Sequence, residues 1–197
     1  MKFFIILISI LPLGIFSQEI PENHTNFGAY IGFAQVGAIT VEDLPDGHDI
    51  GGTGTFPNFG ITKGIIVGSM PLTLGLGFGH RGYSYASPFS DIEVSADYLD
   101  FMVGTGYPVG PINLTSLLLV GTSMGSGTIK SGDAENDIDE DFGEDTDYGI
   151  MFGLNYWLND NISLDTGYYV GLAELGEDGA EMKFVGLTFS LGYKFQF

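Results

Sequence analysis

The sequence predicts an all-β protein: an eight-stranded antiparallel up-and-down β-barrel whose strands span a membrane. Three observations lead to this prediction. Eight segments alternate bulky apolar residues with small or polar ones, long and short connections follow one another in strict turn, and no apolar run of 18 residues occurs after the N-terminal region. The first is typical of strands with one apolar face, the second of a meander, and the third excludes membrane-spanning helices.

The N-terminal segment 1–17, MKFFIILISILPLGIFS, is typical of a secretory signal peptide. Lys2 precedes an apolar stretch that is shorter than the roughly 20 residues a helix needs to span a bilayer. We expect cleavage before Gln18, which leaves 18–197 as a single barrel domain. The sequence has no cysteine, so disulfides and a lipid-modified cysteine are both excluded.

The chain is strongly acidic, and its charge is unevenly distributed. Six basic residues stand against 25 acidic ones, which gives a net charge of −19. Such a chain repels phosphate, so nucleic acid is excluded as a partner. Nine of the acidic residues fall within the segment 133–147, DAENDIDEDFGEDTD, while the remainder of the chain is rich in glycine and aromatic residues. The composition therefore indicates an apolar body with a charged rim.

The eight expected strands have alternating faces. In the last one, for example, Leu187, Phe189 and Leu191 share one face, while Thr188 and Ser190 share the other. Frequent glycine also disfavours helix, at a cost of about 1 kcal/mol per residue relative to alanine. The expected strands are 27–38, 57–68, 72–85, 93–107, 112–126, 147–158, 162–174 and 183–197.

The connections indicate how the strands follow one another. Tight turns rich in Pro, Gly and Asn lie at 69–71, 108–111 and 159–161, and between them lie the longer connections 39–56, 86–92, 127–146 and 175–182. In bacterial outer-membrane barrels the periplasmic turns are short, the external loops are long, and the number of strands is even. The order of connections fits that pattern with eight strands.

The composition of the second face decides between a soluble barrel and a membrane barrel. A soluble barrel needs an outer face covered with charged residues. Here the second face is mostly Gly, Ser, Thr and Ala, which suits the narrow interior of an eight-stranded barrel better. The apolar face is therefore expected to contact lipid. Lys63 is an exception, because it falls on the face of Phe59 and Ile61 and needs a bulge or a position near the headgroups.

With these features the chain resembles the small eight-stranded outer-membrane barrels of the OmpA and OmpX type. The resemblance rests on the signal segment, the eight alternating strands, and the aromatic residues Tyr193, Phe195 and Phe197 at the end of the chain. It implies a monomer in the bacterial outer membrane, with outer-membrane lipid as its surroundings. It also implies that these three aromatic residues form the signal read by the barrel-assembly machinery.

Four charged residues are predicted to face the lumen: Arg81, Asp100, Asp165 and Lys194. We expect Asp165 and Lys194 to lie at similar heights and to pair. Arg81 is expected to pair with Asp100, with Asp97 as the alternative. Buried charges need partners, so the favoured interpretation is a set of ion pairs that plugs the lumen. The alternative is a gated conduction path.

A few residues are candidates for metal binding or for catalysis. Asp137, Asp139 and Asp141 form a weak candidate for loose divalent binding, but Phe142 and Tyr148 stand where an EF-hand needs Gly and Glu. A solvated external loop is favoured, and no cofactor is expected. His80 and the nearby Ser84 could serve a lipid A-modifying enzyme, yet the sequence favours a non-enzymatic protein.

The predicted function is a structural or surface-interaction role in the outer membrane. The acidic external connection 127–146 is the expected contact element for an extracellular ligand. A narrow pore or small-solute transport protein is the first alternative, and the lipid A-modifying enzyme is the second.

Overall fold

The structure, a computed structural model, describes residues 25–40, 48–52, 54–87, 91–131, 134–138, 146–173 and 182–195. Among these residues no helix is long and apolar enough to cross a membrane. The strands are β1 (Phe27–Thr40), β2 (Asp49–Gly52), β3 (Phe56–Val67), β4 (Met70–Ala86), β5 (Asp91–Val109), β6 (Ile112–Ser131), β7 (Ala134–Ile138), β8 (Thr146–Trp157), β9 (Ile162–Gly171) and β10 (Met182–Lys194).

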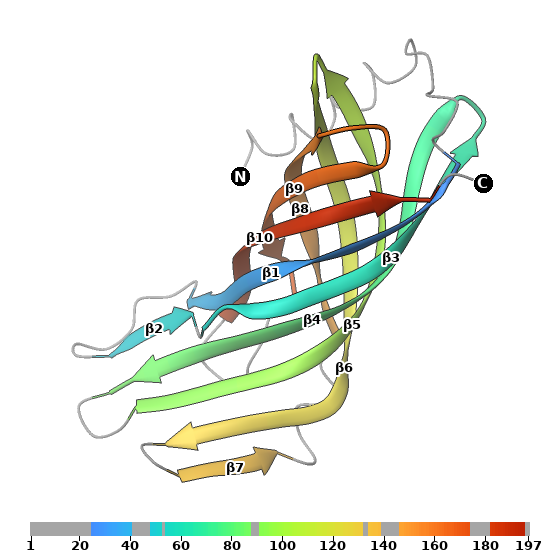
Figure 1. The fold of residues 1–197 in the computed structure, drawn as a ribbon. Coiled ribbons are helices and arrows are strands. Elements are labelled where there is room, and N and C mark those ends of the chain that lie inside the picture. Colours follow the sequence, from blue (N-terminus) through green and yellow to red (C-terminus); the bar gives the residue numbers. More distant parts are fainter. Residues whose placement is uncertain are drawn as a thin grey trace.

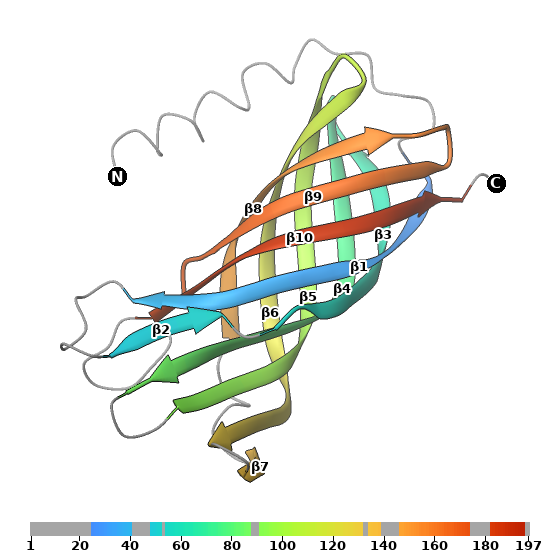
Figure 2. The ribbon, with the colours of Figure 1, turned by 60° about the vertical axis from the view of Figure 1, so that its left-hand side comes forward.

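The eight long strands form a closed antiparallel ring (Figures 1 and 2). Each pairs with the next along the chain, and β1 closes the ring by pairing with β10 from Gly28–Lys194 to Thr40–Met182. Closure matters because an unpaired strand edge in lipid leaves backbone groups without hydrogen-bond partners. The predicted eight-stranded up-and-down barrel is confirmed.

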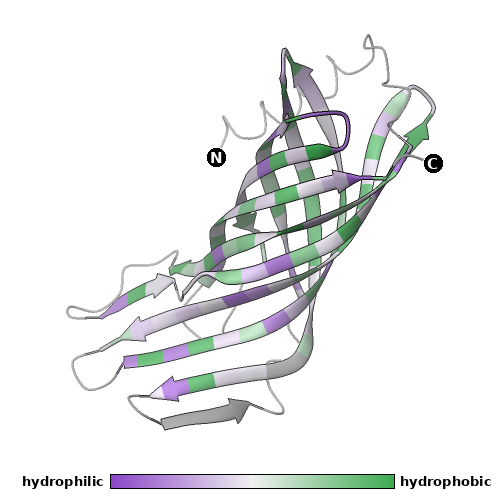
Figure 3. Ribbon diagram, in the orientation of Figure 1, coloured by the Kyte–Doolittle hydropathy of each residue, from purple (hydrophilic) through white to green (hydrophobic). Residues whose placement is uncertain are grey.

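The outer face of the ring carries the apolar residues. In Figure 3 hydrophobic positions alternate with less hydrophobic ones along the strands. Ile31 and Phe33 are 64% and 61% exposed, which in water would be unfavourable and in lipid is not. Other exposed apolar side chains of this face are Phe27, Phe59, Ile61, Leu74, Leu76, Phe101, Leu118, Leu154, Leu164, Tyr168, Leu187, Phe189 and Leu191.

Lys63 lies on the outer face near the short-turn end of the barrel. Its Nζ donates to the backbone oxygen of Thr25 and lies 4.1 Å from the centroid of the Phe27 ring. A lysine that close to the end of a strand can place its ammonium group at the headgroup level. The charge is accommodated without a bulge in β3, where pairing with β1 and β4 is regular.

Beyond the ring, at the long-connection end, the sheet continues as an extension. The ladder between β3 and β4 ends at Phe59–Phe78, two residues from Pro57, which has no N–H to donate. β2 then takes the place of β3 by pairing with β4 from Gly52–Tyr83 onward. With β7 paired to β6, the extension has the strand order β2-β4-β5-β6-β7. The sequence missed both short strands, which lie within the expected long connections.

Candidate functional site in the barrel lumen

Arg81 of β4 stands at the centre of a buried charged cluster inside the ring. Its Nη2 donates to Oδ1 of Asp100 on β5 over 2.6 Å, and its Nε lies 2.7 Å from Oδ2 of Asp147 on β8. The hydroxyl of Tyr169 on β9 donates to the same Asp147 oxygen over 2.7 Å. Four strands therefore contribute to one network that crosses the lumen.

Aromatic rings surround the guanidinium group. Its Cζ lies 4.4 Å from the Tyr98 ring centroid and 5.5 Å from that of Tyr169, and the Tyr98 ring meets the Phe184 ring edge-on. Arg81 is 3% exposed and Asp147 is fully buried. Charges removed from water to this degree are stable only with close partners, which the two carboxylates and the ring faces supply.

A glycine makes room for the cluster. Gly121 of β6 pairs with Asp100 on one side and with Asp147 on the other. A Cβ at Gly121 would lie 2.5 Å from Oδ1 of Asp100 and 3.0 Å from Nη2 of Arg81. The charged groups thus occupy the space that any larger residue at this position would fill.

Of the four predicted lumen charges, the structure brings Arg81 and Asp100 together. Asp97, the alternative partner, lies on the other face of β5, where its Oδ1 is 2.7 Å from Nδ1 of His80. The sequence interpretation missed Asp147, which it assigned to the acidic segment 133–147. The signal was present, because alternation from Tyr148 on the outer face puts Asp147 on the inner one.

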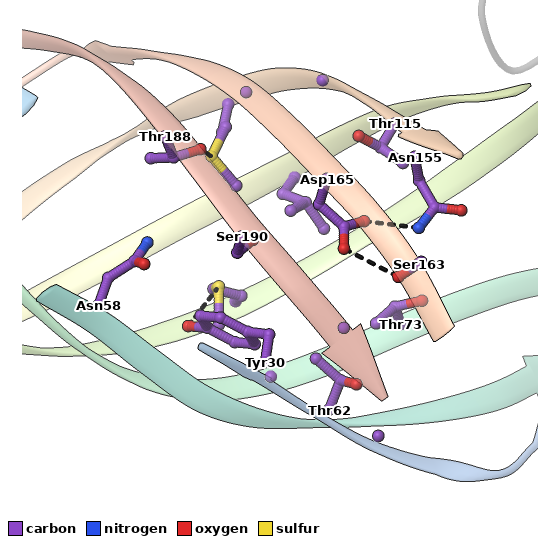
Figure 4. Close-up of a pocket in the computed structure, with 18 of the residues that line it drawn as sticks. Tyr30, Asn58, Thr62, Thr73, Thr115, Asn155, Ser163, Asp165, Thr188 and Ser190 are labelled. Carbon is purple, nitrogen blue, oxygen red and sulfur yellow. Dashed lines mark hydrogen bonds between the residues drawn. The ribbon is translucent and has the colours of Figure 1, made fainter. Parts of the chain in front are cut away.

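The expected ion pair of Asp165 and Lys194 is corrected by the structure, which gives the two side chains different partners. Asp165 accepts hydrogen bonds from Nδ2 of Asn155 over 2.5 Å and from Oγ of Ser163 over 2.9 Å (Figure 4). Lys194 places its Nζ 4.0 Å from the centroid of the Trp157 ring. The heights were misjudged: Asp165 pairs with Ser190, which lies four residues from Lys194, or about 13 Å along a strand.

Between the charged cluster and the short-turn end the lumen holds a cavity of about 390 Å³. Its lining runs from Arg81 and Asp100 down to Pro71, Pro108 and Lys194 beside the turns. Figure 4 shows side chains from several strands pointing into it. Hydroxyl and amide groups are prominent among them, namely those of Tyr30, Asn58, Thr62, Thr73, Thr115, Asn155, Ser163, Thr188 and Ser190.

The remaining candidate residues lie elsewhere. His80 is on the outer face, and Ser84 is four residues further along β4, in the extension, where it pairs with Gly51 and Glu93. Four residues of strand separate them by about 13 Å, too far for a hydrogen bond. The side chains of Asp137, Asp139 and Asp141 lie outside the described residues, as does the segment 1–17. Within the described ranges no three His, Asp or Glu side chains cluster as metal ligands do.

The aromatic residues at the end of β10 face outward. The rings of Tyr193 and Phe195 meet edge-on with centroids 5.1 Å apart, and the two side chains are 47% and 39% exposed. Phe197 lies outside the described part of the chain. Their role as an assembly signal stays a prediction.

The comparisons define the class of protein to which this barrel belongs. The model of the outer membrane protein beta-barrel domain family matches residues 8–195, so the chain belongs to that family. It is a bacterial outer-membrane protein with membrane-spanning β-strands, as the resemblance seen in the sequence predicted. No match was found among curated proteins.

Solved structures share the fold at low sequence identity. Neisserial surface protein A (NspA) superposes with a TM-score of 0.54 at 15% identity, covering 86% of this chain and 97% of its own. Ail, the attachment invasion locus protein of Yersinia pestis, gives 0.52 at 15% identity, covering 87% and 99%. The outer membrane protease OmpT of Escherichia coli gives 0.42 at 10% identity, covering 90% and 99%, a score too low to carry an argument about activity.

Proposed function

We propose that this protein is a non-conducting outer-membrane barrel that acts as a rigid structural scaffold for surface interaction. The observation that carries the proposal is the Arg81 cluster, in which one guanidinium group lies between carboxylates of two other strands. An eight-stranded barrel is only just wide enough for its own side chains. A buried network across that width leaves no continuous path for water or ions.

The energetics of the cluster favour a permanent plug over a gate. Separating Arg81 from its carboxylates would leave buried charges unpaired, at a cost of about 3–5 kcal/mol. The hydrogen bond from Tyr169 and the contact with the Tyr98 ring oppose movement as well. Spontaneous opening is therefore rare.

The extension supports the surface role. Strands β4, β5 and β6 run without a break from the barrel wall into the extension, so they hold the extension rigidly beyond the ring (Figures 1 and 2). Its outer face is polar: Ser95 and Thr128 are hydrogen-bonded over 3.0 Å, and Glu93 pairs in register with Lys130. We assign the contact with an extracellular ligand to this extension together with the acidic connection 127–146.

Planar-bilayer recording with the purified full chain tests the plug. The wild type should give no unitary current steps, and Lys194→Ala, which alters the lumen far from the cluster, should be equally silent. The double variant Arg81→Ala/Asp147→Ala should open a path and give steps.

Reproducible unitary steps in the wild type would contradict a plugged lumen and would favour the narrow-pore alternative. Silence of the double variant would show that the cluster is not the barrier. Heat-dependent migration on detergent gels establishes that each variant is folded before it is recorded.

A further inference from the structure

The cavity below the charged cluster contains polar groups that the described part of the chain leaves without a hydrogen-bond partner. Nη1 of Arg81 and Oδ1 of Asn58 are buried and have no hydrogen-bond partner among the residues that the structure describes. Arg81 is almost completely buried, and both residues line the cavity. A buried orphan donor or acceptor is costly, so such atoms mark places where another molecule completes the bonding.

The two orphan atoms lie at the same level of the barrel. Phe59 pairs with Phe78, so Asn58 and Gly79 come next along their two strands. Nη1 of Arg81 is 4.0 Å from the position that a Cβ on Gly79 would take. One atom needs an acceptor and the other needs a donor. A hydroxyl group supplies both functions.

We propose that this cavity is a binding pocket for a small neutral polyhydroxylated molecule, such as a monosaccharide or cyclic polyol, that enters from the short-turn, periplasmic end. This inference goes beyond the scaffold role. A volume of about 390 Å³ lies within the range of small-molecule sites. The pocket reaches the turns through Pro71 and Pro108, whereas the Arg81 cluster bounds it at the other end.

The charges of the lining favour a neutral ligand. Arg81 already faces two carboxylates, which oppose an anion at Nη1. Lys194 lies beside the entrance and repels small cations. Asp165, the acid of the lining on the entrance side, uses both of its oxygens to accept from Asn155 and Ser163.

The walls combine hydroxyl groups with apolar surface, as sugar-binding sites require. Thr62, Thr115 and Ser190 reach into the cavity from three different strands, so hydrogen-bonding groups surround a ligand instead of lining one side (Figure 4). Met102 and Met151 supply apolar contacts for ring C–H groups. Trp157 lines the pocket at its entrance and is the single tryptophan of the sequence.

That single tryptophan provides the test. The full chain in detergent micelles is titrated with D-glucose and with myo-inositol while the fluorescence of Trp157 is recorded, and sodium acetate and choline chloride serve as charged probes. We expect a saturable change with at least one neutral probe and none with the charged ones. Asn58→Ala should weaken binding about tenfold, as expected for loss of one buried hydrogen bond. Ser190→Leu should abolish it by filling the cavity.

Thr122→Val is the matched control, because Thr122 is exposed on the outer face of β6 and should leave the titration unchanged. The proposal is overturned if neither neutral probe gives saturation, if acetate or choline binds more tightly, or if Ser190→Leu responds like the wild type. Should Ser190→Leu not fold, Thr115→Leu replaces it with the same expected loss. Conductance is measured in a separate experiment. A conducting lumen would contradict the plugged barrel, whereas a failed titration would contradict only the binding pocket.

Discussion

Arg81 is the residue on which the interior of this barrel depends. Its guanidinium group compensates Asp100 and Asp147, packs on the Tyr98 ring, and also lines the cavity below. Alternation along the strands predicted that Arg81 and Asp100 point inward. It could not predict which charges meet, because pairing depends on strand register around the ring. Asp165 and Lys194 were mismatched for that reason.

Replacing Arg81 tests this dependence. Arg81→Ala leaves two buried carboxylates without a cation and should lower the free energy of unfolding by about 3–5 kcal/mol. Urea unfolding of the full chain in lipid vesicles measures the change. Lys63→Ala is the matched control: it removes an exposed cation over the Phe27 ring and should cost less than about 1 kcal/mol.

A triple variant separates charge from packing. Arg81→Ala/Asp100→Asn/Asp147→Asn removes the uncompensated charges as well and should recover more than half of the loss. If Arg81→Ala lowered the free energy of unfolding no more than Lys63→Ala does, the barrel interior would not depend on Arg81. A triple variant as unstable as the single one would show that packing, not charge, is responsible.

At the scale of elements, the long strands follow from alternation and the short ones do not. The expected ranges match the ring strands to within a few residues, except that β6 continues to Ser131, past the expected end at 126. β2 has the sequence DIGG and β7 has AENDI, too short and too irregular to show a period of two. They form because the ends of β4 and β6 offer free edges to pair with.

The short turns were recognised from their Gly, Pro and Asn content, and one of them gives a sharp prediction. Gly110, between β5 and β6, has φ of +63°, a conformation that costs other residues about 1–2 kcal/mol. Gly110→Ala should therefore destabilise the barrel by about that amount in urea unfolding. Gly106→Ala is the control, because its Cβ would meet only ordinary contacts at 3.8 Å or more. Equal stability of the two variants would show that the turn is not strained by a side chain.

For the whole molecule, the central claim is that the apolar face of the barrel points outward and contacts the lipid of the outer membrane. That face was predicted from the small size of the residues opposite it, and the closed ring with its exposed apolar exterior agrees. The lumen cavity was not predicted from the sequence, because its size depends on how side chains from all strands pack around a common axis.

The most direct measurement of that claim uses the absence of cysteine from the sequence. Single cysteines at 187, 188, 189, 190 and 191 of β10 are each given a small trifluoroethylthio tag, and the full chain is placed in vesicles that contain spin-labelled lipid. The ¹⁹F signals at 187, 189 and 191 should be strongly broadened by the lipid, and those at 188 and 190 should stay sharp. Uniform broadening, or broadening at the even positions instead, would contradict the account.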